Sequence, residues 1–150
     1  MNQRAESDLM RVIVFAIGPH LFALPMKVVV KISPRPPELH PDFDDVGLLD
    51  LEGETVRLLR LEQLLDLNAP TTRPFLILVR TPQGLGGIQV TELPNMMELP
   101  MATIQTLPDA STMLRRLSQY VALWHLGNGQ QPIFLLDLAL TFDQLALKGR

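Results

Sequence analysis

Cysteine is absent from the 150-residue chain, which excludes disulfides, thiolate metal sites and cysteine nucleophiles. Aromatic residues are also scarce, at 5% against 47% hydrophobic residues, so the core must consist of Leu, Val, Ile and Met. Basic clusters are missing, since no run of Lys and Arg exceeds the pair Arg115-Arg116. Together with a net charge of −3, this argues against a general nucleic-acid-binding protein.

The chain also lacks an uninterrupted hydrophobic run of membrane-spanning length. Its most apolar window, Val12 to Val30, is divided by Pro19 and Pro25 into pieces of strand length. Acidic rather than basic residues precede this window. We therefore expect neither a signal peptide nor a membrane span, and we expect a cytoplasmic protein.

Proline and glycine, in contrast, are spread along the whole length. Thirteen prolines and nine glycines divide a chain that is about one domain long into many short segments. Frequent proline and glycine residues favour β-structure over long helices, and we expect about nine strands with three or four helical turns. Because no βαβ unit repeats, the order of elements favours small β-barrels over a doubly wound sheet.

The most informative stretch runs from Val46 to Leu67. Apolar and polar residues alternate from Leu49 to Gly53 and the apolar residues resume at Val56, with Glu52-Gly53-Glu54 between the two runs. This pattern predicts a β-hairpin with one buried face. From Leu61 onward the leucines fall at helical spacing, which predicts a short helix after the hairpin.

The remaining elements are predicted from apolar runs and turn signals. Strands are expected at Arg11–Ile17, Leu21–Leu24, near Val30, Phe75–Arg80, Gly84–Val90, Tyr120–Leu126 and Ile133–Leu138, with a strand or bend at Leu93–Leu99. Helical turns are expected at Pro25–Val30, near Met113–Leu117 and, as a short amphipathic helix, at Leu138–Leu147. The segments Ser33–Asp45 and Gly127–Gln131 are expected to be loops, the first because its four prolines oppose strand pairing.

Residues with catalytic or metal-binding chemistry do not form a recognisable site. His20, His40 and His125 have no second ligand at metal spacing, which favours solvated or core histidines. Asp42, Asp44 and Asp45 resemble the start of a calcium loop. However, the twelfth position of that loop is Gly53 rather than a bidentate Glu, which favours a solvated acidic loop.

The serine, glycine and methionine patterns likewise do not indicate a catalytic or phosphate-binding site. Ser7, Ser33, Ser111 and Ser118 have no Gly-x-Ser-x-Gly setting. Gly84-Leu85-Gly86-Gly87 follows one predicted strand and opens the next, which indicates a hairpin and close packing rather than a phosphate site. The methionines at 96, 97, 101 and 113 suit a core, although adaptable methionines also suit a docking surface.

Taken in order, these motifs resemble the CheW-like domain, the adaptor fold of bacterial chemosensory arrays, from about Arg11 to Phe142. The resemblance rests on VIVFAIGPHLFALPMKVVVKI, on Pro41-Asp42-Phe43 before Gly47, on the central hairpin, on FLILVR with GGIQV, and on Tyr120 followed by a glycine loop and IFLLDL. It implies a mainly β fold of two small five-stranded SH3-like barrels packed together. The expected organisation is a mobile tail at 1–10, one domain at 11–147 and a short tail at 148–150.

The resemblance also implies a function. Such a domain is a non-catalytic adaptor without cofactor or metal, which binds the regulatory domain of a chemotaxis histidine kinase and, in the groove between its barrels, the tip of a chemoreceptor. Recruitment to membrane-associated receptor arrays would follow. Seven positions match the family's docking surfaces: Val29, Lys31, Glu52, Gly53, Phe75, Gly87 and Met96. Each has an alternative role, as core for Val29, Phe75 and Met96, as backbone geometry for the glycines, and as plain surface for the charged pair.

The chain departs from the family pattern at several positions. The central Asn-Leu-Arg-Gly of the family is Asp50-Leu51-Glu52-Gly53 here, and the following Pro and Asp are Arg57 and Arg60. A later Asp-Gly-Val is replaced by Thr91-Glu92-Leu93, and a family glutamate falls on Lys31. Two family positions of opposite charge are thus both reversed, and we hypothesise that Lys31 and Glu52 keep an ion pair with its sign exchanged.

Two other functions stay open at this point. The first is a CheW-like fold reassigned to a different partner, such as a motility or pilus regulator, because the central arginine is lost. A small-molecule-binding or hydrolytic β-barrel is a third class, which would need a polar constellation in a pocket.

Overall fold

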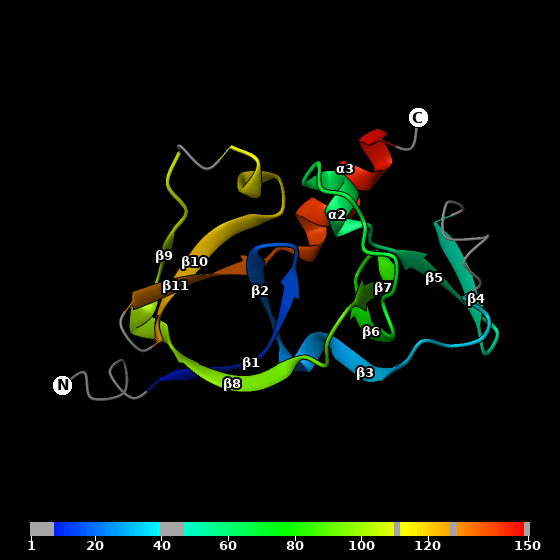
Figure 1. Ribbon diagram of the computed structural model, residues 1–150, viewed down its shortest axis with the longest axis horizontal. Coiled ribbons are helices and arrows are strands. Elements are labelled where there is room, and N and C mark those ends of the chain that lie inside the picture. The colour runs from blue at the N-terminus through cyan, green and yellow to red at the C-terminus, as the bar shows by residue number, and fades with distance from the viewer. Residues whose placement is uncertain (1–7, 40–46, 110–111, 127–128, 149–150) are drawn as a thin grey trace.

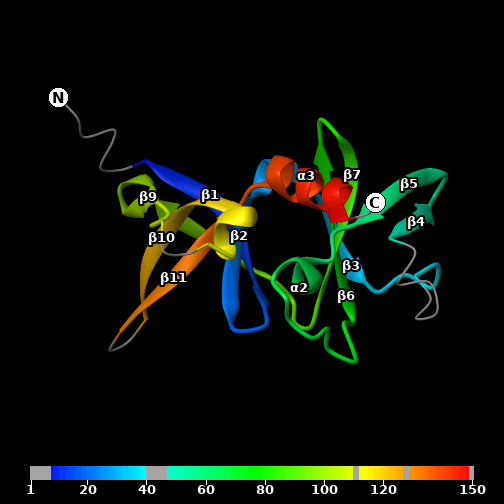
Figure 2. The same ribbon diagram turned by 90° about the horizontal axis from the view of Figure 1, so that it is seen from above.

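The computed structural model describes residues 8–39, 47–109, 112–126 and 129–148. Within these residues the chain forms eleven strands, arranged as two sheets that lie side by side (Figures 1 and 2). The expected mainly β fold with two small packed barrel-like sheets is therefore confirmed.

The first sheet contains six strands in the order β8-β1-β2-β11-β10-β9. Their bounds are β1 Leu9–Ile17, β2 His20–Pro25, β8 Asn95–Pro100, β9 Ile104–Thr106, β10 Ser118–Leu126 and β11 Gly129–Leu136. All neighbours are antiparallel except β11 and β2, which are parallel. The N-terminal hairpin is thus flanked by strands from the C-terminal half of the chain, since β1 pairs with β8 and β2 with β11.

The second sheet contains five strands in the order β3-β6-β7-β5-β4. Their bounds are β3 Val29–Pro34, β4 Leu48–Leu51, β5 Glu54–Leu58, β6 Phe75–Thr81 and β7 Gly84–Val90. Only the pair β5 and β7 is parallel. Both edges of this sheet, β3 and β4, come from the segment before the central turn at residues 52–53.

Short helices connect and cover the sheets. They are η1 Met26–Val28, α2 Leu61–Leu64, η3 Met101–Thr103, η4 Leu114–Arg116 and the longer α3 Leu138–Lys148. Helices α2 and α3 lie between the two sheets, as both views show (Figures 1 and 2). Three leucines of the α2 segment, Leu61, Leu64 and Leu65, are buried there, as their helical spacing predicts.

Three hydrophobic clusters hold the structure together. The largest, which we call the inter-sheet cluster, combines Phe22 of β2 and Ile77 of β6 with Leu61 of α2, and so joins both sheets. A second cluster lies within the second sheet and contains Leu49, Leu51, Val56 and Leu58 of the hairpin. A third, around Val12 and Leu99, lies within the first sheet. The alternation in β4 and β5 therefore points one face of the hairpin into a core, as predicted.

Close packing explains two glycines of β7. A Cβ on Gly86 would lie 3.0 Å from Leu59 Cδ1, and one on Gly87 would lie 3.2 Å from both Leu76 Cδ1 and Val56 Cγ1. The Gly84–Gly87 motif is thus a hairpin strand that allows close approach of apolar side chains, in agreement with its interpretation from sequence.

Several expectations about element bounds were wrong. Strand β3 continues through Ser33 and Pro34, which pair with Leu76 and Phe75, although the prolines were expected to prevent pairing. Proline is accepted because β3 is an edge strand and needs no donor on its free side. The first sheet has six strands rather than five, since β9 was not foreseen in the segment of mixed polarity.

The C-terminal hairpin also differs from expectation. Residues 129–131, expected to be a loop, belong to β11, and Leu138, expected to end that strand, is the first residue of α3. At the other end, β1 begins at Leu9, two residues before the expected Arg11.

Candidate functional site

One candidate site opens at the end of the second sheet, and we call it the barrel mouth. It is a cavity of about 230 Å³ whose apolar lining comes from Val30, Leu51, Val56, Leu78 and Leu85. Four charged side chains also line it: Lys31, Glu52, Glu54 and Arg80. An apolar floor beneath charged groups of both signs suits a protein contact, because burial supplies affinity and charge supplies selectivity.

The hypothesised pair is present at this mouth. Lys31 Nζ lies 4.0 Å from Glu52 Oε1, and the side chains are 46% and 79% exposed. Lys31 stands on edge strand β3 and Glu52 in the turn after edge strand β4, so the pair joins the two edges of the sheet. An exposed pair of this kind contributes only about 0–1 kcal/mol to stability.

A second ion pair lies at the same mouth. Arg80 Nη2 of β6 is 3.9 Å from Glu54 Oε2 of β5, with side chains 63% and 58% exposed. Residue Glu54 directly follows the turn that carries Glu52, so the hairpin presents two carboxylates to two cations on other strands.

The turn that carries Glu52 has a demanding backbone. Both Glu52 and Gly53 have positive φ, 52° and 83°, and they form a two-residue connection between the paired residues Leu51 and Glu54. This is the arrangement of a type I′ turn, whose twist matches that of the strands. Glycine tolerates it without cost, whereas Glu is an uncommon residue there.

A second candidate site lies between the two sheets, and we call it the inter-barrel groove. It has a volume of about 280 Å³. Leu24, Pro25 and Leu136 line it from the first sheet, Arg80 and Pro82 from the second, and Val28, Leu138 and Ala139 from the helices. Most of these side chains are apolar, so the groove suits an apolar segment of a partner.

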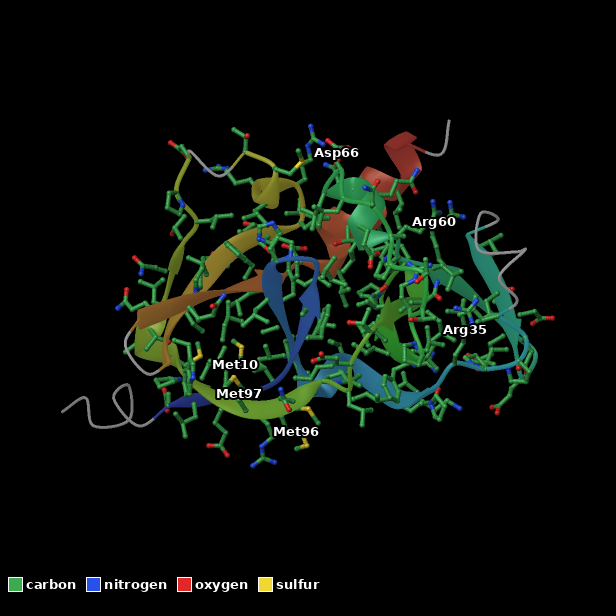
Figure 3. The ribbon with its side chains drawn as sticks, in the orientation of Figure 1. Met10, Arg35, Arg60, Asp66, Met96 and Met97 are labelled. Carbon is green, nitrogen blue, oxygen red and sulfur yellow. The ribbon has the colours of Figure 1, made fainter. Side chains whose placement is uncertain are left out.

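The structure brings together only part of the set chosen from sequence. Lys31, Glu52 and the adjacent Gly53 meet at the barrel mouth. Val29 and Phe75 are partly buried and pack against the inter-sheet cluster, while Gly87 is buried in β7. Met96 lies on the other sheet, is 67% exposed, and projects outward from β8 (Figure 3).

Several site residues were not identified from the sequence. Arg80 and Glu54 line the mouth, and Leu24, Pro25, Val28 and Leu138 line the groove. Arg80 is the one charged residue at the end of the apolar run that forms β6, which was the one available signal for the mouth. The residues of the groove have no such signal in the sequence, because apolar residues that line a groove follow the same sequence pattern as apolar residues of a core.

Apart from Lys31 and Glu52, the departures from the pattern expected of the resemblance fall at three places. Arg57 is half-buried on β5, and Arg60 precedes α2 with its guanidinium against Gly47, where a Cβ would come within 2.9 Å of Nη2. Thr91, Glu92 and Leu93 line a third cavity, of about 210 Å³, at the first sheet beside Trp124.

Buried polar contacts within the described residues are structural in character. Arg73 Nη1 lies 3.5 Å from Glu62 Oε1 of α2, and both side chains are almost fully buried. Arg35 Nε donates to the Leu39 carbonyl at 3.0 Å and its Nη1 to Gln89 Oε1 at 3.1 Å, which fastens the segment after β3 to β7. Both contacts tie a loop to a neighbouring element.

The described part of the chain offers no group of three metal-ligating His, Asp or Glu side chains. His20 lies edge-on to Phe134 at a centroid distance of 6.0 Å, as a core-lining residue would. The acidic residues 42, 44 and 45, with His40 and Ser111, lie outside the described residues. None of the helices described is both long and apolar enough to span a bilayer.

Comparison with known proteins shows which family and which solved structures this chain is similar to. A family model for the CheW-like domain matches residues 11–146. Among solved structures, the scaffolding protein TtCheW from Thermoanaerobacter tengcongensis is similar over 91% of this chain and 94% of its own, with a TM-score of 0.70 and 16% sequence identity. At that identity the likeness is one of fold. A search of curated proteins found no match.

Proposed function

Since the chain belongs to the CheW-like domain family, we propose that it is a non-catalytic adaptor that couples a chemotaxis histidine kinase to a chemoreceptor. It acts through its surfaces, in the cytoplasm, and enters receptor arrays through its partners. The observation that carries the proposal is the presence of two surfaces on one small chain, the barrel mouth and the inter-barrel groove, which have only Arg80 in common.

The barrel mouth is the proposed surface for the regulatory domain of the kinase. Its apolar lining takes an aliphatic side chain of the partner, while Lys31 and Glu52 face charged neighbours of that side chain. The pair contributes little to folding because it is exposed, so its role is partner selection. Gly53 keeps the turn in shape, and Gly87 allows Val56 of the lining to pack close to β7, whereas Val29 and Phe75 pack against the inter-sheet cluster.

The inter-barrel groove is the proposed surface for the receptor tip. Leucine, valine and proline side chains from both sheets, from η1 and from α3 form most of its apolar lining. An amphipathic helical segment of a receptor buries its apolar stripe in such a groove. Met96, exposed on β8, offers an adaptable apolar contact outside the groove.

A second candidate keeps the fold but changes the partner. The Lys31–Glu52 pair has the opposite polarity to the pair expected from the family resemblance. A partner that matches the family polarity would meet like charges here, which disfavours binding. The candidate is therefore an adaptor for a different protein, such as a motility or pilus regulator.

The first experiment measures binding of the purified protein to the regulatory domain of a chemosensory histidine kinase from the same genome, by titration calorimetry. Wild type, Lys31→Glu, Glu52→Arg and the double variant are compared. We expect saturable micromolar binding by wild type and weaker binding by each single variant. The double variant restores the pair with inverted polarity, and we expect its binding to stay weak because the partner distinguishes that polarity.

A matched control is the Arg11–Glu98 pair of the first sheet, at 3.8 Å and 68% and 51% exposed. Its inversion, Arg11→Glu with Glu98→Arg, should leave kinase binding unchanged. Recovery of wild-type affinity by the Lys31/Glu52 double variant would show that the pair is only structural. If wild type does not bind the kinase and Glu52→Arg does, the fold serves a different partner.

A further inference from the structure

The third cavity, which we call the Trp124 cavity, lies on one face of the first sheet. Leu21 of β2 pairs with Ala16 of β1 and with Ile133 of β11. Ile133 pairs in turn with Ala122 of β10, and Trp124 lies two residues further along that strand, so both side chains point to the same face. Leu21 and Trp124 pack against the third hydrophobic cluster and line the cavity. The indole of Trp124 therefore belongs to the wall of this cavity.

The size of the cavity suits one long side chain. Its volume is about 210 Å³, below the roughly 300–1,000 Å³ of pockets that enclose a drug-sized ligand. Leu93, which is 61% exposed, also lines it and offers apolar surface to a molecule that covers the opening. A small cavity beside an exposed apolar side chain is the arrangement that receives a single anchor residue of a protein partner.

The charge of that anchor follows from Glu92. Among the described residues that line the cavity, Glu92 is the only charged one, and no described cation forms an ion pair with it. It is exposed and lies on the link between β7 and β8. An apolar anchor would displace water from this carboxylate and return no hydrogen bond, which costs free energy. A cationic anchor replaces the lost hydrogen bonds, so the cavity favours a cation.

We propose that the Trp124 cavity is a third docking surface, which receives an arginine side chain of a protein partner. The guanidinium stacks on the indole of Trp124 and pairs with Glu92, and Leu93 contacts an apolar neighbour of that arginine. Arginine fits better than lysine, because its planar guanidinium both stacks on an aromatic face and matches a carboxylate. The inference goes beyond the proposed function, since neither the barrel mouth nor the inter-barrel groove includes Glu92 or Trp124.

Trp124 is the only tryptophan of the chain, so its fluorescence reports on the cavity directly. The full-length protein is titrated with the peptide acetyl-Leu-Arg-Leu-amide at constant ionic strength. Two further peptides carry lysine or the neutral citrulline in place of the arginine. We expect a saturable change with the arginine peptide and an affinity about two- to fivefold higher than for the citrulline peptide, the range of an exposed charge contact. The lysine peptide should lie between them.

Two variants assign the preference to the cavity. Glu92→Gln should bind the arginine and citrulline peptides equally. Trp124→Leu, followed by calorimetry, should bind the arginine peptide about two- to fivefold more weakly than wild type. The matched control is Glu98→Gln, which removes the same charge from an exposed residue of β8 that pairs with Arg11 outside the cavity. It should keep the full preference for arginine, and a thermal melt by circular dichroism verifies that each variant folds.

Four results would overturn the inference: no saturable change with the arginine peptide, equal binding of the arginine and citrulline peptides by wild type, a preference that persists in Glu92→Gln, or an equal loss of preference in Glu98→Gln. The last would mean that net charge rather than the cavity attracts the peptide. These titrations contain no kinase or receptor, so failure of the proposed function is seen separately and leaves this inference standing.

Discussion

At the scale of single residues, Glu52 combines an unfavourable backbone with an exposed charge. Its φ of 52° lies in the left-handed region, where Asn and Gly are common and Glu is not. Such a conformation costs on the order of 1 kcal/mol for a non-glycine residue. The fold alone would favour Asn at the first position of this turn. An unfavoured residue at this exposed turn agrees with the proposed role of the Glu52 carboxylate in partner binding.

We predict that Glu52→Asn stabilises the protein while it weakens kinase binding. Relief of the backbone strain should raise the free energy of unfolding by about 0.5 kcal/mol, after subtraction of the weak pair with Lys31. Urea denaturation followed by circular dichroism measures the first effect, and titration calorimetry the second.

Glu54→Asn is the matched control for that substitution. Glu54 is also exposed and paired with a cation, to Arg80, but it lies in β5 with an ordinary strand backbone. There the change to Asn should lower stability, since Asn is disfavoured in strands. Equal destabilisation by the two substitutions would mean that the turn is not strained at Glu52.

At the scale of elements, Asp137 links three parts of the chain. It precedes α3, and its Oδ1 accepts a hydrogen bond at 3.0 Å from the backbone N–H of Leu140. Its Oδ2 accepts another, at 2.7 Å, from Nε2 of Gln119 on β10. As an N-cap it satisfies one of the free N–H groups of the helix and fixes where α3 begins. Leu138 and Ala139, the first two residues of the helix, line the groove.

Removal of this cap should loosen the start of α3. We predict that Asp137→Ala lowers the free energy of unfolding by about 0.5–2 kcal/mol, the usual cost of losing an N-cap side chain. Binding of a receptor-tip fragment should weaken as well, because the groove loses part of a fixed wall. Urea denaturation and calorimetry measure the two effects.

Asp137→Asn keeps an oxygen acceptor for the Leu140 N–H and is a good N-cap, so most of the stability should return. An Asn variant as unstable as the Ala variant would show that the bond from Gln119, rather than the cap, is what holds this junction.

At the scale of the whole molecule, the two sheets share one core. The inter-sheet cluster contains Ile13 and Phe22 from the first sheet, Ile77 and Ile88 from the second, and Leu61 from α2. Neither sheet can bury these residues by itself. The two barrels should therefore unfold together, in a single cooperative transition.

This cooperativity can be tested with a substitution in one barrel and a probe in the other. Leu58 is buried in the cluster of the second sheet, and Trp124, the only tryptophan, lies on β10 of the first. We predict that Leu58→Ala destabilises the protein by about 2–5 kcal/mol. Trp124 fluorescence and far-ultraviolet circular dichroism should report the same shifted midpoint in urea.

A Trp124 transition that stays at the wild-type midpoint while the dichroism signal shifts would contradict this view. The second sheet would then unfold independently of the first.

Much of the fold could be predicted from local pattern. Gly84–Val90 was expected as a strand and is β7, and the hairpin around Glu52 and Gly53 lies where alternation indicated it. These elements were predicted correctly because period-2 alternation and turn residues act over a few neighbouring positions. Strand β9 and the first residues of β11 were missed because their pairing partners, rather than their own sequence, make them strands.

The sequence by itself determined the family, the mainly β architecture and the opposite charges of Lys31 and Glu52, because each depends on residue types at fixed positions along the chain. Only the tertiary structure decided that these two charges lie 4.0 Å apart on opposite edges of one sheet, and that Arg80 lines two cavities at once. The groove between the sheets likewise exists only after β2, β6 and α3 come together. The physical reason is that contacts between distant segments depend on strand order and packing, which no local pattern specifies.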